Sequence, residues 1–183
     1  MWRLELLQVR SDLDWSSPAE LLIAGEETSH SLYFELTQGW TGLLVEPLAA
    51  GLSFKNRRAT VSSSCLATQP RPHYVHFDME STALLDQENN ISAMGGIVEE
   101  SGEDTMTLQC VPLYTLLLAL GNPTVNWFIL DIEGAEFQVL QTLPWHLVDI
   151  EMVSVETDLA GLVMPGSRQE IIDFMKSKGY LHL

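Results

Sequence analysis

The chain has 183 residues, with 25 acidic and 9 basic side chains, so its formal net charge at pH 7 is −16. This length predicts one domain, and an apolar content of 46% is too high for a disordered chain. The charge excludes a general nucleic-acid binder, because phosphate backbones are bound by clustered Lys and Arg. We interpret the one basic cluster, Lys55, Arg57 and Arg58, as the solvated end of a helix.

No segment of this sequence is predicted to insert into a membrane or to span one. The longest apolar run, residues 111–120, is about half of a membrane span, and charges interrupt the first ten residues. As written, the chain is expected to be cytoplasmic. The two cysteines, Cys65 and Cys110, lie in apolar surroundings and are predicted to be buried free thiols, with a single disulfide as the alternative.

The expected elements alternate between strands and helices. After weak signals in residues 1–20, a short strand is expected at 21–23, a helix at 31–38 ended by Gly39, a buried strand at 43–45, and a helix from Pro47 to about residue 58. Residues 78–104 have no sustained period and are expected to form a long loop that carries short elements, of a length that is usually functional or mobile. The other expected strands are 59–66, 73–77, 107–111, 125–131, 149–156 and 180–183, and the other helices are 112–120, 134–143 and one capped by Ser167 that ends before Gly179.

Strands that alternate with helices, several of them wholly apolar, predict an α/β domain with an open, mostly parallel sheet covered by helices on both faces. In such a sheet, ligands bind beyond the carboxyl ends of the strands. Glu46 closes the strand G-L-L-V-E-P at 42–47 and lies 46 − 25 = 21 positions after Gly25, a spacing typical of an acid that holds ribose hydroxyls. The alternative is that Glu46 has no ligand and lies near the N-terminus of the following helix, where the helix dipole favours a carboxylate.

A second group of carboxylates follows the apolar strand at 125–131. Asp131 ends that strand, and Glu133 and Glu136 occupy the turn and the first helical turn. These three acids could position a ligand, hold a divalent cation or act as a base, while helix capping alone would explain Glu136. His73 and His76 should point to opposite faces of one strand and would not share a metal ion. Between the three possibilities for the acids, we predict a ligand or base role and no metal site. The chain has no G-x-G-x-x-G, Walker or G-x-S-x-G motif.

Several blocks of the sequence together resemble the FkbM-type methyltransferase family. They are S-L-Y-F-E at 31–35, G-W-T-G-L-L-V-E-P at 39–47, C-L-A-T at 65–68, Q-C-V-P-L-Y-T-L-L at 109–117, L-D-I-E-G-A-E at 130–136 and V-D-I-E…S-V-E at 148–156. The pattern is similar to the arthropod branch that contains Star-like proteins. The resemblance covers about residue 24 to the end of the chain.

The resemblance implies a Rossmann-like fold that binds S-adenosylmethionine over residues 21–183, preceded by a diverged segment at 1–20. It implies that Glu46 holds the ribose hydroxyls and that Asp131 is the catalytic residue beside methyl donor and acceptor. Gly25, Glu133 and Glu136 would complete the cofactor site. Family methyltransferases typically act on a hydroxyl oxygen, and the methyl acceptor of this chain is not indicated.

The chain departs from the family at the first strand. The family has a glycine-rich turn of the form G-A-x-D-G, whereas residues 21–25 here are L-L-I-A-G, which keep only Gly25. A bulky Leu21 would obstruct the approach of the backbone to the cofactor. Two hypotheses follow: an O-methyltransferase of full or reduced activity, and a non-catalytic Star-like protein that acts through protein partners in trafficking or growth-factor receptor signalling. On the second hypothesis, the protein would be associated with endomembranes through a Star-like anchor that lies outside this sequence.

Overall fold

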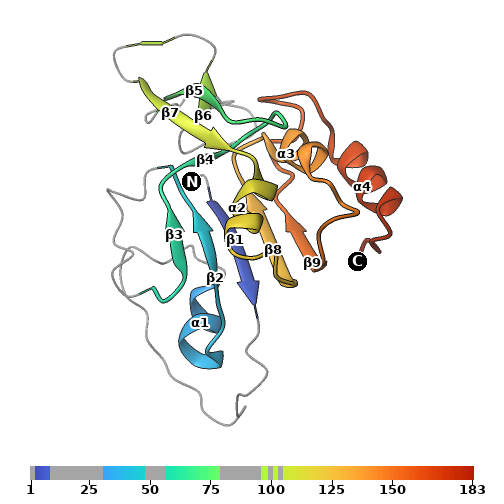
Figure 1. Ribbon diagram of the computed structural model, residues 1–183. Helices are drawn as coiled ribbons and strands as arrows, with labels where there is room; N and C mark the ends of the chain where they lie inside the picture. The colour runs from blue at the N-terminus through green and yellow to red at the C-terminus, as the bar shows by residue number, and fades with distance from the viewer. Residues whose placement is uncertain (1–2, 9–30, 48–56, 79–95, 99–100, 103–104) are drawn as a thin grey trace.

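The computed structural model describes residues 3–8, 31–47, 57–78, 96–98, 101–102 and 105–183 (Figure 1). Gly25, the expected strand at 21–23, most of the expected helix after Pro47 and most of the expected loop at 78–104 lie outside these residues. The described helices and strands are β1 Arg3–Gln8, α1 Leu32–Gln38, β2 Thr41–Val45, β3 Thr60–Ser62, β4 Cys65–Leu66, β5 His73–Asp78, β6 Gly96–Val98, β7 Thr105–Val111, α2 Leu113–Ala119, β8 Val125–Asp131, α3 Glu136–Thr142, β9 Ile150–Val155 and α4 Arg168–Ser177.

The larger sheet has the strand order β3-β2-β1-β8-β9. β2 is parallel to β3 and β8 is parallel to β9, while the central strand β1 is antiparallel to both of its neighbours. Four strands of this sheet therefore run in the same direction: β2, β3, β8 and β9. The sheet was expected to be mostly parallel, and this expectation is wrong at the centre, where β1 runs the opposite way. Sequence periodicity indicates that a segment is extended, whereas the direction of pairing depends on distant partners.

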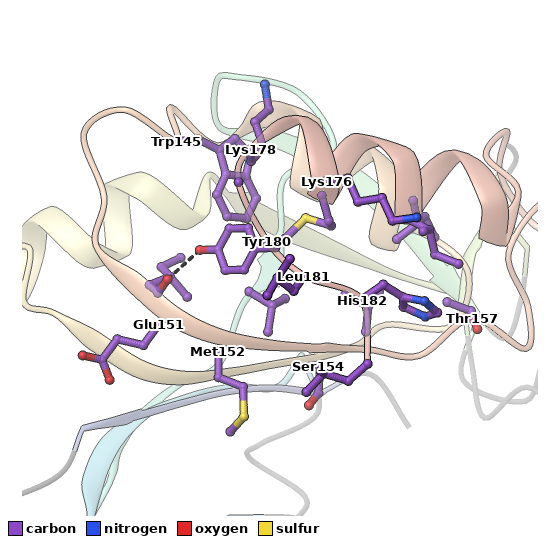
Figure 2. Close-up of a pocket in the computed structure, with 18 of the residues that line it drawn as sticks. Trp145, Glu151, Met152, Ser154, Thr157, Lys176, Lys178, Tyr180, Leu181 and His182 are labelled. Carbon is purple, nitrogen blue, oxygen red and sulfur yellow. Dashed lines mark hydrogen bonds between the residues drawn. The ribbon is translucent and has the colours of Figure 1, made fainter.

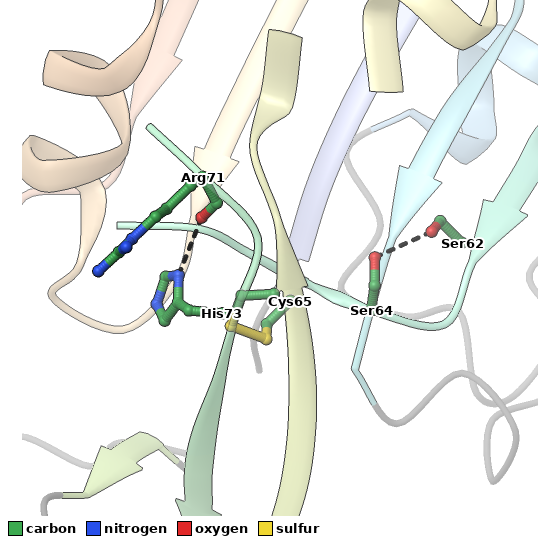
Figure 3. Close-up of a disulfide and its surroundings, with 6 residues drawn as sticks. Ser62, Ser64, Cys65, Arg71 and His73 are labelled. Atoms are coloured by element: carbon green, nitrogen blue, oxygen red, sulfur yellow. Dashed lines mark hydrogen bonds between the residues drawn. A yellow bond between two sulfur atoms is a disulfide. The ribbon is translucent and has the colours of Figure 1, made fainter. Parts of the chain in front are cut away.

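A second sheet, with the order β4-β7-β5-β6, lies beyond the edge at which β2 and β9 end (Figure 1). β5 is antiparallel to both β6 and β7. The expected single strand at 59–66 is divided between the sheets, since β3 belongs to the larger one and β4 to the smaller. Ser62 and Ser64 share a side-chain hydrogen bond of 2.9 Å at this break (Figure 3). The alternation of residue types did not reveal that the chain changes sheets there.

Cys65 and Cys110 form a disulfide (Figure 3), which corrects the prediction of free thiols. The two residues lie opposite each other in the parallel pair β4 and β7, and both are fully buried. Their burial was expected. The disulfide was the alternative, and the sequence could not decide it, because 45 positions separate the two cysteines and only the register of two strands from distant segments brings them together.

Helices α1 to α4 agree closely with the pattern of the sequence. The expected solvated helix end is wrong at Arg57, which is not helical and whose buried side chain forms an ion pair of 2.8 Å with Glu35. Gly39 ends α1 in the left-handed conformation, with φ 65°. α4 begins at Ser167 with the expected capping box, in which Ser167 and Glu170 bond each other's backbone amides. Side chains of α2, α3 and α4 pack with those of β2, β7 and β8 in one apolar core. None of the helices in the described part of the chain is long and apolar enough to span a membrane.

The expected last strand is absent, because residues 180–183 form no regular structure. Instead the Tyr180 hydroxyl donates a hydrogen bond of 2.6 Å to the carbonyl of Ile150. A short run of apolar residues favours an extended backbone, but a strand forms only where its amides meet a partner.

Candidate functional site

Two of the expected site residues lie at the same edge of the larger sheet. Glu46 follows β2 and Asp131 ends β8, and these strands run in the same direction on either side of β1. Leu4 of β1 pairs with both Val45 and Leu130, so the two strand ends are level. Neighbouring strands are about 4.8 Å apart, which separates the backbones of β2 and β8 by about 10 Å. Glu46 and Asp131 are therefore placed to contact different parts of one ligand.

Glu46 is held firmly at this edge. Its side chain is 1% exposed, and its amide donates a hydrogen bond of 3.0 Å to the carbonyl of Ser62, directly after β2 ends. Burial of a carboxylate is costly unless hydrogen-bond donors surround it. A buried acid at a strand end is thus a feature that packing alone would not favour.

The turn from β8 into α3 has an unusual backbone. Glu133 has φ 56° and Gly134 has φ 95°, so two successive residues are left-handed. A Cβ at Gly134 would lie 2.8 Å from the side chain of Val163 and 3.2 Å from the carbonyl oxygen of Leu159. Only glycine fits there, because it lacks the side chain that both the φ angle and the neighbouring loop exclude. This close packing fixes where Asp131 and Glu133 are presented.

Glu136 holds this turn together from inside. Its side chain is 1% exposed, and its Oε1 accepts hydrogen bonds from the amides of Ile132 at 2.8 Å and Gly134 at 3.2 Å. Burial raises the pKa of Glu136 to about 7; the two amides oppose the shift, and the charge of Glu156 adds to it. The geometry thus gives Glu136 a bracing role in the turn, and the contact with the cofactor that the family resemblance implies stays a prediction.

Glu156 joins the same edge and was not selected from the sequence. It follows β9 directly, and its amide bonds the carbonyl of Leu130, so it lies beside the end of β8. Its Oε1 accepts a hydrogen bond from the amide of Asp158, and its Oε2 is buried and bonds no described residue. Burial raises the pKa of Glu156, and the charges of Asp131, Asp158 and Glu133 raise it further.

A signal for Glu156 was present in the sequence. Like Asp131, it is an acid directly after an apolar strand, and parallel neighbours place such positions side by side. The edge beyond β8 and β9 therefore carries Asp131, Glu133, Glu156 and Asp158. No group of three such residues with a geometry suited to a metal ion occurs in the described ranges.

This arrangement can bind a cationic ligand that also carries hydroxyls. Carboxylates attract positive charge and accept hydrogen bonds from hydroxyl groups, and a protonatable carboxyl can exchange a proton near pH 7.

Residues 19–181 match the family described as the methyltransferase FkbM domain. The chain belongs to this family. The search of curated proteins and the search of solved structures each found no match. The match supports a methyltransferase at the family level and suggests an α/β methyltransferase fold, and methyltransferase families generally use S-adenosylmethionine.

Proposed function

We propose that this FkbM-domain protein transfers a methyl group from S-adenosylmethionine to a hydroxyl oxygen. The observation that carries the proposal is the level placement of Glu46 and Asp131 after two parallel strands about 10 Å apart. The residues fit the cofactor chemically, because it carries vicinal hydroxyls and a sulfonium cation, and the edge offers a buried carboxylate and a group of acids. When bound, S-adenosylmethionine supplies an electrophilic methyl group.

In this proposal Glu46 accepts hydrogen bonds from both ribose hydroxyls. Asp131 lies at the methyl-transfer position, where its carboxylate orients the hydroxyl of the acceptor and takes its proton. Glu133 and Glu156 add negative charge that favours the cationic ligand. Glu136 acts through Ile132 and Gly134 as a positioning residue, since it fixes the turn that presents Asp131. Gly25 remains a proposed contact of the methionine moiety.

Isothermal titration calorimetry with S-adenosylmethionine and its demethylated product tests the proposal. We expect binding in the micromolar range, and Glu46→Ala should weaken it at least tenfold, because hydrogen bonds to a charged group are worth about 1.5–3 kcal/mol each. Glu151→Ala is the matched control, since this exposed acid bonds Asn126 near the start of β9, at the opposite end of the strand from the candidate site. Full affinity in Glu46→Ala would refute the ribose assignment, and absence of heat at high micromolar cofactor would refute catalysis.

The second candidate is a non-catalytic role in protein interaction, in the manner of Star-like proteins of the arthropod branch. One observation favours it: the position between Glu46 and Asp131 is occupied by the start of β1, with Arg3 opposite Asp131. The diverged residues 21–25 agree with this candidate. A protein that binds neither form of the cofactor, yet unfolds cooperatively, would support it.

A further inference from the structure

The loop that joins β9 to α4, residues 157–166, has an unusual composition for a connecting segment. Only Thr157 and Asp158 have polar side chains, and the rest of the loop reads L-A-G-L-V-M-P-G. Connecting segments at the surface usually carry more polar residues. Leu162 is 56% exposed, although it is a large apolar residue, and Pro165 is exposed beside it in the sequence of the loop. Packing inside the protein therefore does not account for these two side chains.

The loop lies next to the candidate site. It begins directly after Glu156, at the end of the larger sheet where β8 and β9 terminate (Figure 1). It also contacts the turn between β8 and α3, since a Cβ at Gly134 would lie 2.8 Å from the side chain of Val163 and 3.2 Å from the carbonyl oxygen of Leu159. The apolar loop thus adjoins the turn that presents Asp131.

Hydrogen bonds and packing anchor the loop on both sides of Leu162. The amide of Leu162 donates a hydrogen bond of 3.0 Å to the carbonyl of Leu159, whose side chain is 3% exposed. Further along, Met164 packs against the core, and the side chain of Gln138 in α3 donates a hydrogen bond to the carbonyl of Pro165. A binding residue is most effective when the segment that carries it is held in place. Leu162 meets this condition.

The rest of this region is acidic. Asp131, Glu133, Glu156 and Asp158 follow β8 and β9, and the charges of the other three raise the pKa of Glu156. A phosphate or carboxylate on a methyl acceptor would be repelled here, and the net charge of −16 adds to this repulsion. A neutral hydroxyl can instead donate a hydrogen bond to a carboxylate. The surroundings therefore favour an uncharged acceptor.

We propose that residues 157–166 bind the methyl acceptor through Leu162, and that this acceptor is an uncharged alcohol with an apolar body. The inference rests on the proposed methyl transfer. The hydroxyl of the acceptor lies against Asp131, and its apolar carbons cover the exposed part of Leu162. Removal of this apolar surface from water favours binding roughly in proportion to its area. Phosphorylated compounds, and compounds that carry hydroxyls on every carbon, should bind more weakly.

Ligand-observed NMR titration of the full chain, saturated with demethylated cofactor, tests this inference. The probe is cyclohexylmethanol. It is compared with hydroxymethylcyclohexanecarboxylate, which adds a negative charge, and with inositol, which lacks the apolar surface. Each of these two compounds should bind at least about fivefold more weakly than cyclohexylmethanol.

Leu162→Ser should weaken the binding of cyclohexylmethanol about fivefold, because it removes the apolar contact. The side chain is exposed, so the variant should fold. Leu147→Ser is the matched control, since Leu147 is 48% exposed in the loop that enters β9 at the opposite end of the strand. This change should alter the affinity less than about twofold.

Asp158→Asn tests the contribution of charge. It should reduce the difference in affinity between cyclohexylmethanol and its carboxylate analogue, because one repelling charge is removed. Asp173→Asn, at an exposed acid on α4, should leave this difference unchanged.

The inference is overturned if cyclohexylmethanol does not bind, if the three compounds bind equally, or if Leu162→Ser binds as tightly as the unmodified chain. Calorimetry with the cofactor separates this failure from that of the proposed function. Absence of cofactor binding would refute both. Cofactor binding without these preferences among the three compounds would refute the acceptor assignment alone.

Discussion

Burial, hydrogen bonding and charge all act on one carboxyl group, that of Glu136. The side chain is buried, two backbone amides point at one of its oxygens, and Glu156 lies close enough to repel it. The amides favour the charged form and burial favours the neutral form, and burial dominates. A residue that appears from the sequence to be a helix-terminus acid is thus the internal support of the turn that presents Asp131.

The raised pKa of Glu136 should make the free energy of unfolding depend on pH. The pKa of Glu136 rises from 4.5 to about 7 on folding, so the folded state binds its proton more tightly than the unfolded state. The resulting stabilisation is complete below about pH 4.5 and is lost as the pH rises through about 7, with a total of about 3 kcal/mol. We expect Glu136→Gln, which keeps an oxygen for both amides, to remove most of this slope in urea unfolding measured from about pH 5 to 7.

Glu170→Gln provides the control for that experiment. Ser167 lowers the pKa of Glu170, so this group titrates below the window and its removal should leave the slope unchanged. An equal slope in Glu136→Gln and the unmodified chain would show that other acids, Glu156 foremost, carry the dependence.

At the scale of elements, the link between β4 and β7 joins the two halves of the chain. β4 follows β3 of the larger sheet, β7 leads into α2, and the Cys65–Cys110 bond fixes the two strands to each other. The bonded residues are fully buried in the shared core. Closing a loop of this length restricts the unfolded chain much more than the folded one.

Removal of the disulfide should therefore lower the free energy of unfolding. The separation of 45 residues corresponds to a loss of about 4 kcal/mol on the chain-entropy account. We expect a decrease of 2–4 kcal/mol, roughly, for Cys65→Ala/Cys110→Ala in urea unfolding. Addition of a thiol reductant should destabilise the unmodified chain by a similar amount and leave the double variant unchanged. Mass spectrometry that detects two free thiols in the native, unreduced protein would contradict the bond.

For the whole molecule, the central strand β1 decides how the candidate site is assembled. It bonds β2 on one side and β8 on the other, so it sets the separation of Glu46 from Asp131. Its antiparallel direction places its first residues, and not a turn into a helix, at the carboxyl edge. The proposed contacts of Glu46 and Asp131 with one cofactor therefore depend on this strand.

Leu6→Pro tests the central position of β1. Leu6 pairs with Leu43 and with Phe128, and proline would remove a hydrogen bond of the ladder in the middle of the sheet. We expect a loss of about 3 kcal/mol or more in the free energy of unfolding. Hydrogen exchange should protect the amides of 3–8 as strongly as those of 125–131. Ser101→Pro, at an exposed residue outside the strands, should change stability by less than about 1 kcal/mol, and a similarly small effect of Leu6→Pro would refute the central placement.

The sequence determined the local elements and the family. The strand at 125–131, the helix caps at Gly39 and Ser167, and the acids after two apolar strands all follow from interactions between near neighbours, so the residue pattern contains them. The strand order around β1, the second sheet and the pairing of the cysteines connect segments far apart in the chain. The local propensity of a segment cannot predict contacts between residues that are far apart in the sequence.

The candidate site divides in the same way. Glu46, Asp131, Glu133 and Glu136 could be selected because each stands beside a recognisable strand end or helix start. Only the tertiary structure placed Glu156 beside β8 and turned Glu136 inward, because burial and the choice of partner strand are properties of the assembled sheet.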